Sequence, residues 1–212
     1  MKVQNPDGYV SKQISVGNSV TVPSGEIWKV TMTYGEDKDI GNDGGATIEL
    51  DGEPILKMGH SSNGSAGHGT DSSATLILTG GDTIDTEDTG DGTFNPHVGI
   101  SGFRIQDTVD NTPVQERIST SNSVSVPSGE TWLVYPTCGD RDPVANSGTY
   151  VINVNGDPVL RMGFADGDGG GAGGVLKNFG PEMILKSGDT VSYDTYDGVN
   201  SLNNVALFGW KI

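Results

Sequence analysis

The chain is poor in cysteine, in basic residues and in long apolar runs, and each shortage excludes a class of protein. Its single cysteine, Cys138, rules out an intramolecular disulfide framework and a zinc-ribbon pattern. No apolar run reaches the roughly 18 residues of a membrane span, and no basic segment followed by an apolar one stands at the N-terminus. We therefore expect no membrane insertion and no signal peptide.

The shortage of basic residues leaves the chain strongly acidic. Lys and Arg number 12 against 28 Asp and Glu, so the formal net charge at pH 7 is −16 and the isoelectric point is about 4.2. Such an anion repels nucleic acid and anionic membranes, so neither is an expected partner. An aspartate-rich, lysine-poor composition is typical of proteins from salt-loving organisms, where concentrated salt screens the repulsion. An ordinary acidic surface is the alternative.

An internal repeat dominates the sequence. The longest repeated segment reads NSVTVPSGEIWKV in the first half and NSVSVPSGETWLV in the second. Four segments of the first half return in the second half in the same order. These pairs are 18–30 and 122–134, 51–59 and 155–163, 81–85 and 188–192, and 100–105 and 207–212. Because the matches keep their order over the whole length, the sequence predicts two copies of one domain.

Each copy has the pattern of an all-β domain. Short runs of alternating apolar and polar residues are separated by Gly, Asn-Gly and Asp-Gly, and no helical period persists. Trp28 and Val30, for example, fall on one face of a strand, with Lys29 and Thr31 on the other. An Asp-Gly pair at 51–52 between two apolar runs predicts a tight hairpin. About eight strands per copy are typical of a β-sandwich or jelly roll.

We therefore predict an all-β chain of two tandem, internally duplicated jelly-roll or β-sandwich domains. The predicted segments are an N-terminal arm or first edge strand at 1–13, a first domain at 14–105, a linker at 106–117 and a second domain at 118–212. Large apolar residues that recur in both copies are expected to form the core scaffold, because the fold requires them twice. These residues are Trp28, Met58, Phe103, Trp132, Met162 and Trp210.

The two copies differ in aromatic content and in charge. Aromatic residues are more than twice as frequent in the second copy, while the first copy is the more acidic. Protein interfaces are rich in aromatic residues and poor in charge, so we predict a partner-facing second domain and a solvated first domain. The alternative is that two duplicated cores diverged independently. The candidate interface residues are Tyr135, Tyr150, Phe164, Phe179, Tyr193 and Tyr196.

No motif indicates a catalytic chemistry, so we expect no enzyme. The chain lacks the spacing of a nucleophile elbow and of a phosphate-binding loop. Two groups of aspartates partly match a calcium loop, but each has a non-acidic residue, Ile48 or Lys177, at the twelfth position. We expect no cofactor beyond weakly bound calcium or magnesium at these positions. The candidate ligands are Asp37, Asp39, Asp43, Asp166 and Asp168.

The repeated segments Val20–Val30 and Val124–Val134 resemble jelly-roll domains of virion proteins. Each has a strand followed by VPSGE, one residue, Trp, one residue and Val, and the later repeated segments fit the same pattern. The resemblance spans nearly all of both copies. Such domains occur in head-decoration, turret and tail proteins of tailed viruses, and they share no catalytic residues.

Together with the acidic composition, the resemblance implies a non-enzymatic capsid decoration or turret protein of a virus with a halophilic, archaeal host. A small tandem-barrel capsid subunit is a variant of this interpretation. The expected partners are further copies of the chain, as a symmetric trimer or pentamer, and the major capsid protein or other virion proteins. The expected location is the capsid surface, after synthesis in the host cytoplasm.

A carbohydrate- or receptor-binding module, on a tail fibre or a secreted protein, is the alternative from another functional class. In that case Tyr193 and Tyr196 of the second domain are expected to stack against sugar rings.

Overall fold

A computed structural model describes residues 8–36, 44–61, 68–70, 73–88, 96–105, 112–139, 147–165, 180–196 and 204–212. Throughout these ranges the regular structure is β-strand. Within them, no helix is long and apolar enough to cross a membrane. The strands of the first domain are β1 (Tyr9–Ser15), β2 (Ser19–Thr21), β3 (Ile27–Glu36), β4 (Gly44–Leu50), β5 (Glu53–Ser61), β6 (His68–Thr70), β7 (Ala74–Thr79), β8 (Thr83–Asp88) and β9 (Pro96–Ile105).

The second domain repeats this succession of strands, but within the described ranges it has no counterpart of β6. Its strands are β10 (Pro113–Ser119), β11 (Val124–Ser125), β12 (Thr131–Gly139), β13 (Ser147–Val154), β14 (Asp157–Ala165), β15 (Met183–Lys186), β16 (Thr190–Tyr196) and β17 (Asn204–Lys211).

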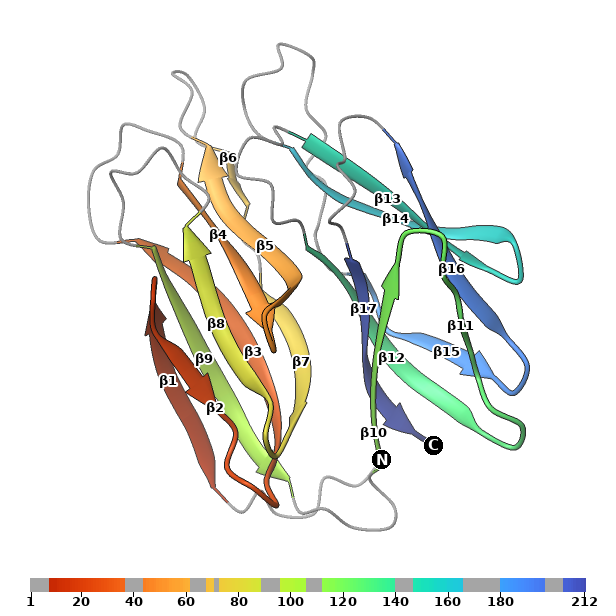
Figure 1. Cartoon of the computed structure of the whole chain (residues 1–212), viewed down its shortest axis with the longest axis horizontal. Helices are drawn as coiled ribbons and strands as arrows, with labels where there is room; N and C mark the ends of the chain where they lie inside the picture. The colour runs from red at the N-terminus through yellow and green to blue at the C-terminus, as the bar shows by residue number, and fades with distance from the viewer. Residues whose placement is uncertain are drawn as a thin grey trace.

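Each domain is a sandwich of two antiparallel sheets (Figure 1). In the first domain, sheet A has the order β1-β9-β3-β7 and sheet B the order β2-β8-β4-β5-β6. In the second, sheet C has the order β10-β17-β12-β15 and sheet D the order β11-β16-β13-β14. Sheet C therefore repeats sheet A strand for strand, and sheet D repeats sheet B without β6. These orders, in which the first and last strands pair, are those of a jelly roll, so the predicted fold is confirmed.

The repeated VPSGE-x-W segment closes one end of each sandwich. The Trp28 Nε1–H donates a hydrogen bond to Glu26 Oε2 at 2.6 Å, and Arg104 of the last strand pairs with Glu26 at 3.3 Å. The second domain has the same arrangement around Glu130. Its partners are Trp132, at 2.7 Å, and Lys211, at 2.6 Å. The bond from Lys211, followed by the bond from Trp132, lowers the pKa of Glu130 below its usual value. The motif is therefore explained by the fold.

The glycine of the repeated last strand is explained by close packing between strands. A Cβ on Gly102 would collide with the backbone of Lys29 and Val30 on the neighbouring strand β3. A Cβ on Gly209 would collide with Leu133 in the same way. Only glycine allows the two central strands of sheets A and C to lie this close.

The first strand of each domain begins earlier than the sequence boundaries suggest. Strand β1 starts at Tyr9 and pairs with β9 along its full length, so residues 9–13 are not an arm but the first edge strand, the other possibility that the sequence left open. Strand β10 starts at Pro113, inside the predicted linker. Both are edge strands that bury only two residues each, Val10 and Ile14 in β1, for instance. A strand with so few apolar residues resembles a polar connection in sequence.

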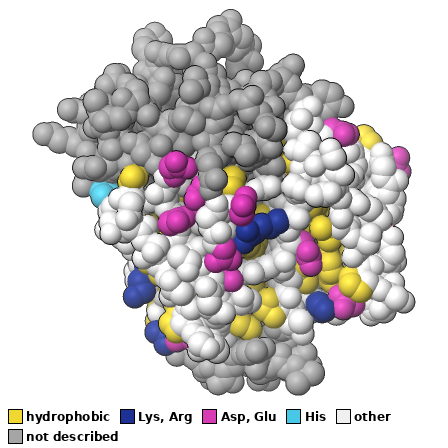
Figure 2. Space-filling model, in the orientation of Figure 1, with side chains coloured by type: hydrophobic (Ala, Val, Ile, Leu, Met, Phe, Trp, Pro, Cys, Tyr) yellow, Lys and Arg dark blue, Asp and Glu magenta, His cyan; other side chains and the backbone are white. Residues whose placement is uncertain are grey.

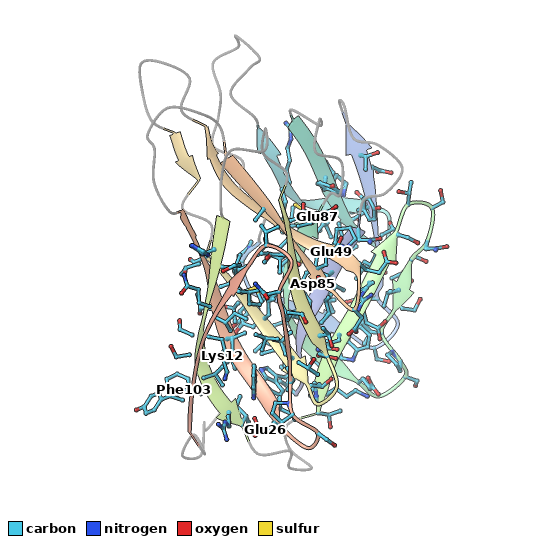
Figure 3. All side chains as sticks on the ribbon, turned by 60° about the vertical axis from the view of Figure 1, so that its left-hand side comes forward. Lys12, Glu26, Glu49, Asp85, Glu87 and Phe103 are labelled. Atoms are coloured by element: carbon cyan, nitrogen blue, oxygen red, sulfur yellow. The ribbon has the colours of Figure 1, made fainter. Side chains whose placement is uncertain are left out.

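The predicted core residues lie in different surroundings. Trp28, Trp132 and Met162 are buried within their own domains. Phe103 is 41% exposed and projects from the outer face of sheet A, so its assignment to the core was wrong (Figure 3). Its counterpart Trp210 is buried, but among residues of the first domain and not inside its own sandwich. The side chain of Met58 lies outside the described part of the structure.

Candidate interaction surfaces

The outer face of sheet C is covered by the first domain over β10, β12 and β17. Strands β12 and β17 lie along β5, and β10 lies along β7 (Figure 1). Phe208 and Trp210 of β17 belong to the same buried cluster as Ile55 of β5 and Ile77 of β7. The two sandwiches therefore share a hydrophobic core where they meet.

Backbone contact brings the two domains together at the end of β12. A Cβ on Gly139 would lie 2.6 Å from the amide nitrogen of Leu56 and 2.7 Å from that of Ile55. Distances this short leave no room for any side chain other than hydrogen. Gly139 therefore fixes how closely β12 approaches β5.

Polar contacts surround this apolar centre. The Gln115 side chain donates to the carbonyl oxygen of Ile77 at 2.7 Å and to Asp82 Oδ2 at 2.6 Å. Arg117 forms an ion pair with Asp51 at 3.2 Å. An apolar centre with a polar rim is the usual anatomy of a specific protein interface.

Tyr135, a predicted interface residue, lies at this contact between the domains. The ammonium group of Lys29 stands 5.7 Å from the centre of its ring, within the range of a cation–π interaction. Its hydroxyl donates to Glu182 Oε2 at 2.8 Å. Burial, followed by the bond to Glu182, raises the pKa of Tyr135 to about 12. Tyr135 thus serves contact within the chain.

Two other predicted interface residues are buried inside the second sandwich. Tyr150 is fully buried and donates to the carbonyl oxygen of Gly139 at 3.2 Å. Tyr193 is 6% exposed and exchanges a hydrogen bond with Thr120 at 3.0 Å, and burial raises its pKa. The two rings pack 5.7 Å apart, centre to centre. Their prediction as partner-facing residues was wrong, because they fill the core.

The remaining predicted interface and metal residues are not characterised by the structure. Phe164 lies in β14 and Tyr196 in β16, but the side chains of both are outside the described part, as is all of Phe179. The candidate calcium or magnesium ligands Asp37, Asp39, Asp43, Asp166 and Asp168 also lie outside it. Within the described ranges, no group of three or more His, Cys, Asp and Glu residues could hold a metal ion.

An acidic cluster that sequence reasoning missed lies on the outer face of sheet B. Glu49 of β4 stands opposite Asp85 of β8, and Glu87 is next to them on β8 (Figure 3). The second domain replaces Glu49 by Asn153, whose side chain donates to Asp194 at 2.9 Å. The cluster is therefore a property of the first domain alone and not a requirement of the fold.

The outer face of sheet A carries an exposed aromatic pair. Tyr9 of β1 and Phe103 of β9 are direct cross-strand neighbours, and their ring centres are 5.4 Å apart. Tyr9 is 78% exposed. The sequence analysis did not single out Tyr9, because residues 1–13 were predicted only as an arm or a first edge strand, with no site residue among them.

The β14–β15 side of the second domain carries a second exposed apolar group. Val159 of β14 is 50% exposed and Ile184 of β15 is 60% exposed. Their counterparts in the first domain, Ile55 and Ile77, are fully buried under sheet C. The same positions of the fold are thus covered in one domain and free in the other.

Comparison with known proteins gives no family for this chain. No protein-family model matches the sequence, and no curated protein matches it. Structures of PNGF-II in two space groups are similar to it, at 9% identity and TM-scores of 0.35 and 0.34. The alignments cover 96% of this chain but 60% of PNGF-II, so this chain spans less than two thirds of that protein. Similarity at this level assigns no function.

Proposed function

We propose that the chain is a non-enzymatic structural protein of a virion, a capsid decoration or turret component of a virus with a halophilic, archaeal host. A small tandem-barrel shell subunit is a variant of the same proposal. One observation carries it: two jelly rolls of the same topology are joined along a sheet face into a continuous block with a shared apolar core. A block of this kind suits a structural protein, which acts through its shape and its contact surfaces and not through a chemical reaction.

The charge distribution supports an assembly that depends on salt. On the face shown in Figure 2, acidic side chains are spread over the surface and basic ones are fewer and set among them. With a net charge of −16, two copies repel each other strongly in dilute salt. The screening length falls from about 10 Å at about 0.1 M salt to about 3 Å at about 1 M, so concentrated salt permits close contact.

The solution mass of the purified chain tests the proposal. Light scattering at about 0.15 M and about 2 M salt is expected to show an oligomer at high salt that dissociates at low salt. Circular dichroism in both solutions serves as the control for folding. A folded monomer at both salts, even at high protein concentration, contradicts a self-assembling virion component.

Carbohydrate binding is the second candidate, favoured by the exposed Tyr9–Phe103 pair. Exposed aromatic rings offer apolar faces on which sugars stack. Tyr193 can no longer carry this hypothesis, because it is buried. A glycan panel probed with the native chain and with Tyr9→Ala distinguishes the two candidates. Binding that Tyr9→Ala abolishes supports a carbohydrate module, and silence across the panel counts against it.

A further inference from the structure

The packing of the two domains leaves one copy of each contact surface free. Within the chain, the outer face of sheet C covers the β5–β7 side of the first domain. The repeat supplies a second face, on sheet A, and a second side, at β14–β15. We call the outer face of sheet A around Tyr9 and Phe103 the free face. The β14–β15 surface around Pro158, Val159 and Ile184 is called the free side.

The free side has kept the apolar character of its covered counterpart. In the first domain, Pro54, Ile55 and Ile77 are all buried. The equivalent residues of the second domain are Pro158, Val159 and Ile184. All three are exposed. Apolar residues stay at these positions although the described part of the second domain leaves them exposed.

The free face has kept two of its apolar positions. Phe103 stands where the second domain has the buried Trp210, and each pairs in register with the first residue of its edge strand, Tyr9 or Pro113. The rest of the face is more polar than sheet C. Ser101 and Thr31 replace Phe208 and Tyr135, and Lys29, whose ammonium group lies 5.7 Å from the ring centre of Tyr135 at the domain contact, replaces Leu133. A contact through the free face is therefore expected to be weaker than the one within the chain.

In the described part of the structure, the exposed apolar residues are concentrated on these two surfaces. The large hydrophobic residues exposed in the described part are Tyr9, Val16, Phe103, Val159, Ile184 and Ile212. Four of these six belong to the free face or the free side. Isolated exposed hydrophobic residues are ordinary, whereas concentration on two matching surfaces indicates contact sites.

We propose that copies of this chain associate head to tail, with the free face of one copy on the free side of the next. The arrangement repeats the contact between the two domains of a single chain. One polar contact at the edge of the domain interface has an equivalent as well. His97 and Asp157 occupy the positions of Asn204 and Glu53, whose side chains are 3.3 Å apart within the chain. His97 Nδ1 shares a hydrogen bond with Ser15 Oγ at 2.9 Å, and the other ring nitrogen is able to donate to a carboxylate as the Asn204 amide does.

Such a contact is heterologous, because the two surfaces that meet are different. Heterologous contacts form a closed ring when the rotation between copies closes, and a filament when it does not. The inference rests on the self-assembly proposed above, and it names the surfaces and the orientation that this assembly uses.

Two double variants test the proposal. The side variant carries Val159→Ser and Ile184→Ser, and the face variant carries Tyr9→Ser and Phe103→Ser. All four side chains are exposed, so both variants are expected to fold. At high salt each variant alone is expected to be monomeric. An equimolar mixture is expected to form a one-to-one dimer and nothing larger, because one intact face and one intact side remain. Val16→Ser, which changes an exposed residue outside both surfaces, is the control.

Each other outcome identifies what is wrong. A side variant that dissociates while the face variant stays oligomeric indicates a symmetric side-to-side contact and overturns the head-to-tail arrangement. Two variants that both stay oligomeric show that other surfaces are used, while self-assembly itself stands. A native chain that is monomeric at high salt removes the proposed self-assembly and this inference with it. Glycan binding lost in the face variant, with assembly unchanged, assigns the aromatic pair to carbohydrate.

Discussion

Sheets A and C have the same strand order and register, yet their outer faces differ in chemistry. Where sheet C has Phe208 and Tyr135 against the first domain, sheet A has Ser101 and Thr31. The inner faces are far more alike, because both must fill a sandwich. In this duplicated fold, residues that fill the sandwich recur in both copies, whereas the residues of an outer face change with what that face meets.

The β5–β7 and β14–β15 sides give the opposite result, and the contrast is informative. Here the free copy remains apolar, with Val159 and Ile184 in place of Ile55 and Ile77. If every surface that the other domain leaves uncovered became polar, the β14–β15 side would have become polar too. Its apolar residues are the main reason to expect a partner there.

The largest expected effect comes from the matched pair Trp210→Ala and Phe103→Ala. Trp210 is buried between the domains, so its truncation is expected to cost about 3–5 kcal/mol. Phe103 occupies the same position in an exposed setting, and its truncation is expected to cost about 1 kcal/mol or less. Urea denaturation of both variants measures the difference. Equal losses contradict the assignment of Trp210 to the interdomain contact.

The fold was predictable because the repeat and the strand pattern are local properties of the sequence. The alternation of Trp28 and Val30 with polar residues predicts a strand without any knowledge of the tertiary structure. The turns that contain glycine separate one strand from the next. Two copies of the pattern gave two independent observations of the same succession. The edge strand β1 was partly missed, because only Val10 and Ile14 of its seven residues are buried.

The contact surfaces could not be predicted, because equivalent positions look alike in sequence. Phe103 and Trp210 are both large aromatic residues in the same motif, and only the packing of the domains decides which is buried. Tyr150 and Tyr193 were predicted as interface residues because the second domain is rich in aromatic residues, but they fill the core of its sandwich. Aromatic content shows that apolar area must be covered, and it does not show by what.

A second matched pair is Ile77→Ala and Ile184→Ala, at equivalent positions of β7 and β15. Ile77 is fully buried under sheet C, so its truncation is expected to destabilise the chain by about 2–5 kcal/mol. Ile184 is 60% exposed, and its truncation is expected to change the free energy of unfolding of the monomer by no more than about 0.5 kcal/mol. Chemical denaturation at low salt, where the chain is expected to be monomeric, gives both values. A large loss for Ile184→Ala at low salt means that the residue already has a partner within its own chain.

The rim of the interdomain contact is expected to matter less than its centre. Gln115→Ala removes the bonds from the side chain to Ile77 and Asp82, and a loss of about 1–2 kcal/mol is expected. Asp82 retains the bond that it accepts from the backbone N–H of Thr79, at 2.6 Å, which limits the cost. Ser11→Ala, at the equivalent exposed position of β1, is the control and is expected to be neutral. The comparison uses thermal or urea unfolding of the two variants side by side.

The smallest expected effect distinguishes the two copies of the VPSGE-x-W motif by their response to acid. Bonds from Lys211 and Trp132 depress the pKa of Glu130, so this carboxylate stabilises the folded state above its unfolded pKa of about 4.5. The contribution is lost as the pH falls through the lower folded pKa. Glu130→Gln is therefore expected to be less stable than the native chain at pH 7, with the difference shrinking below about pH 4.5.

Glu26→Gln is expected to cost less stability at neutral pH, because Arg104 lies 3.3 Å from Glu26 whereas Lys211 lies 2.6 Å from Glu130. Urea midpoints measured from pH 7 down to pH 3 compare the two variants. A gap for Glu130→Gln that stays constant through the acid range contradicts this role, because it means that the carboxylate charge contributes nothing.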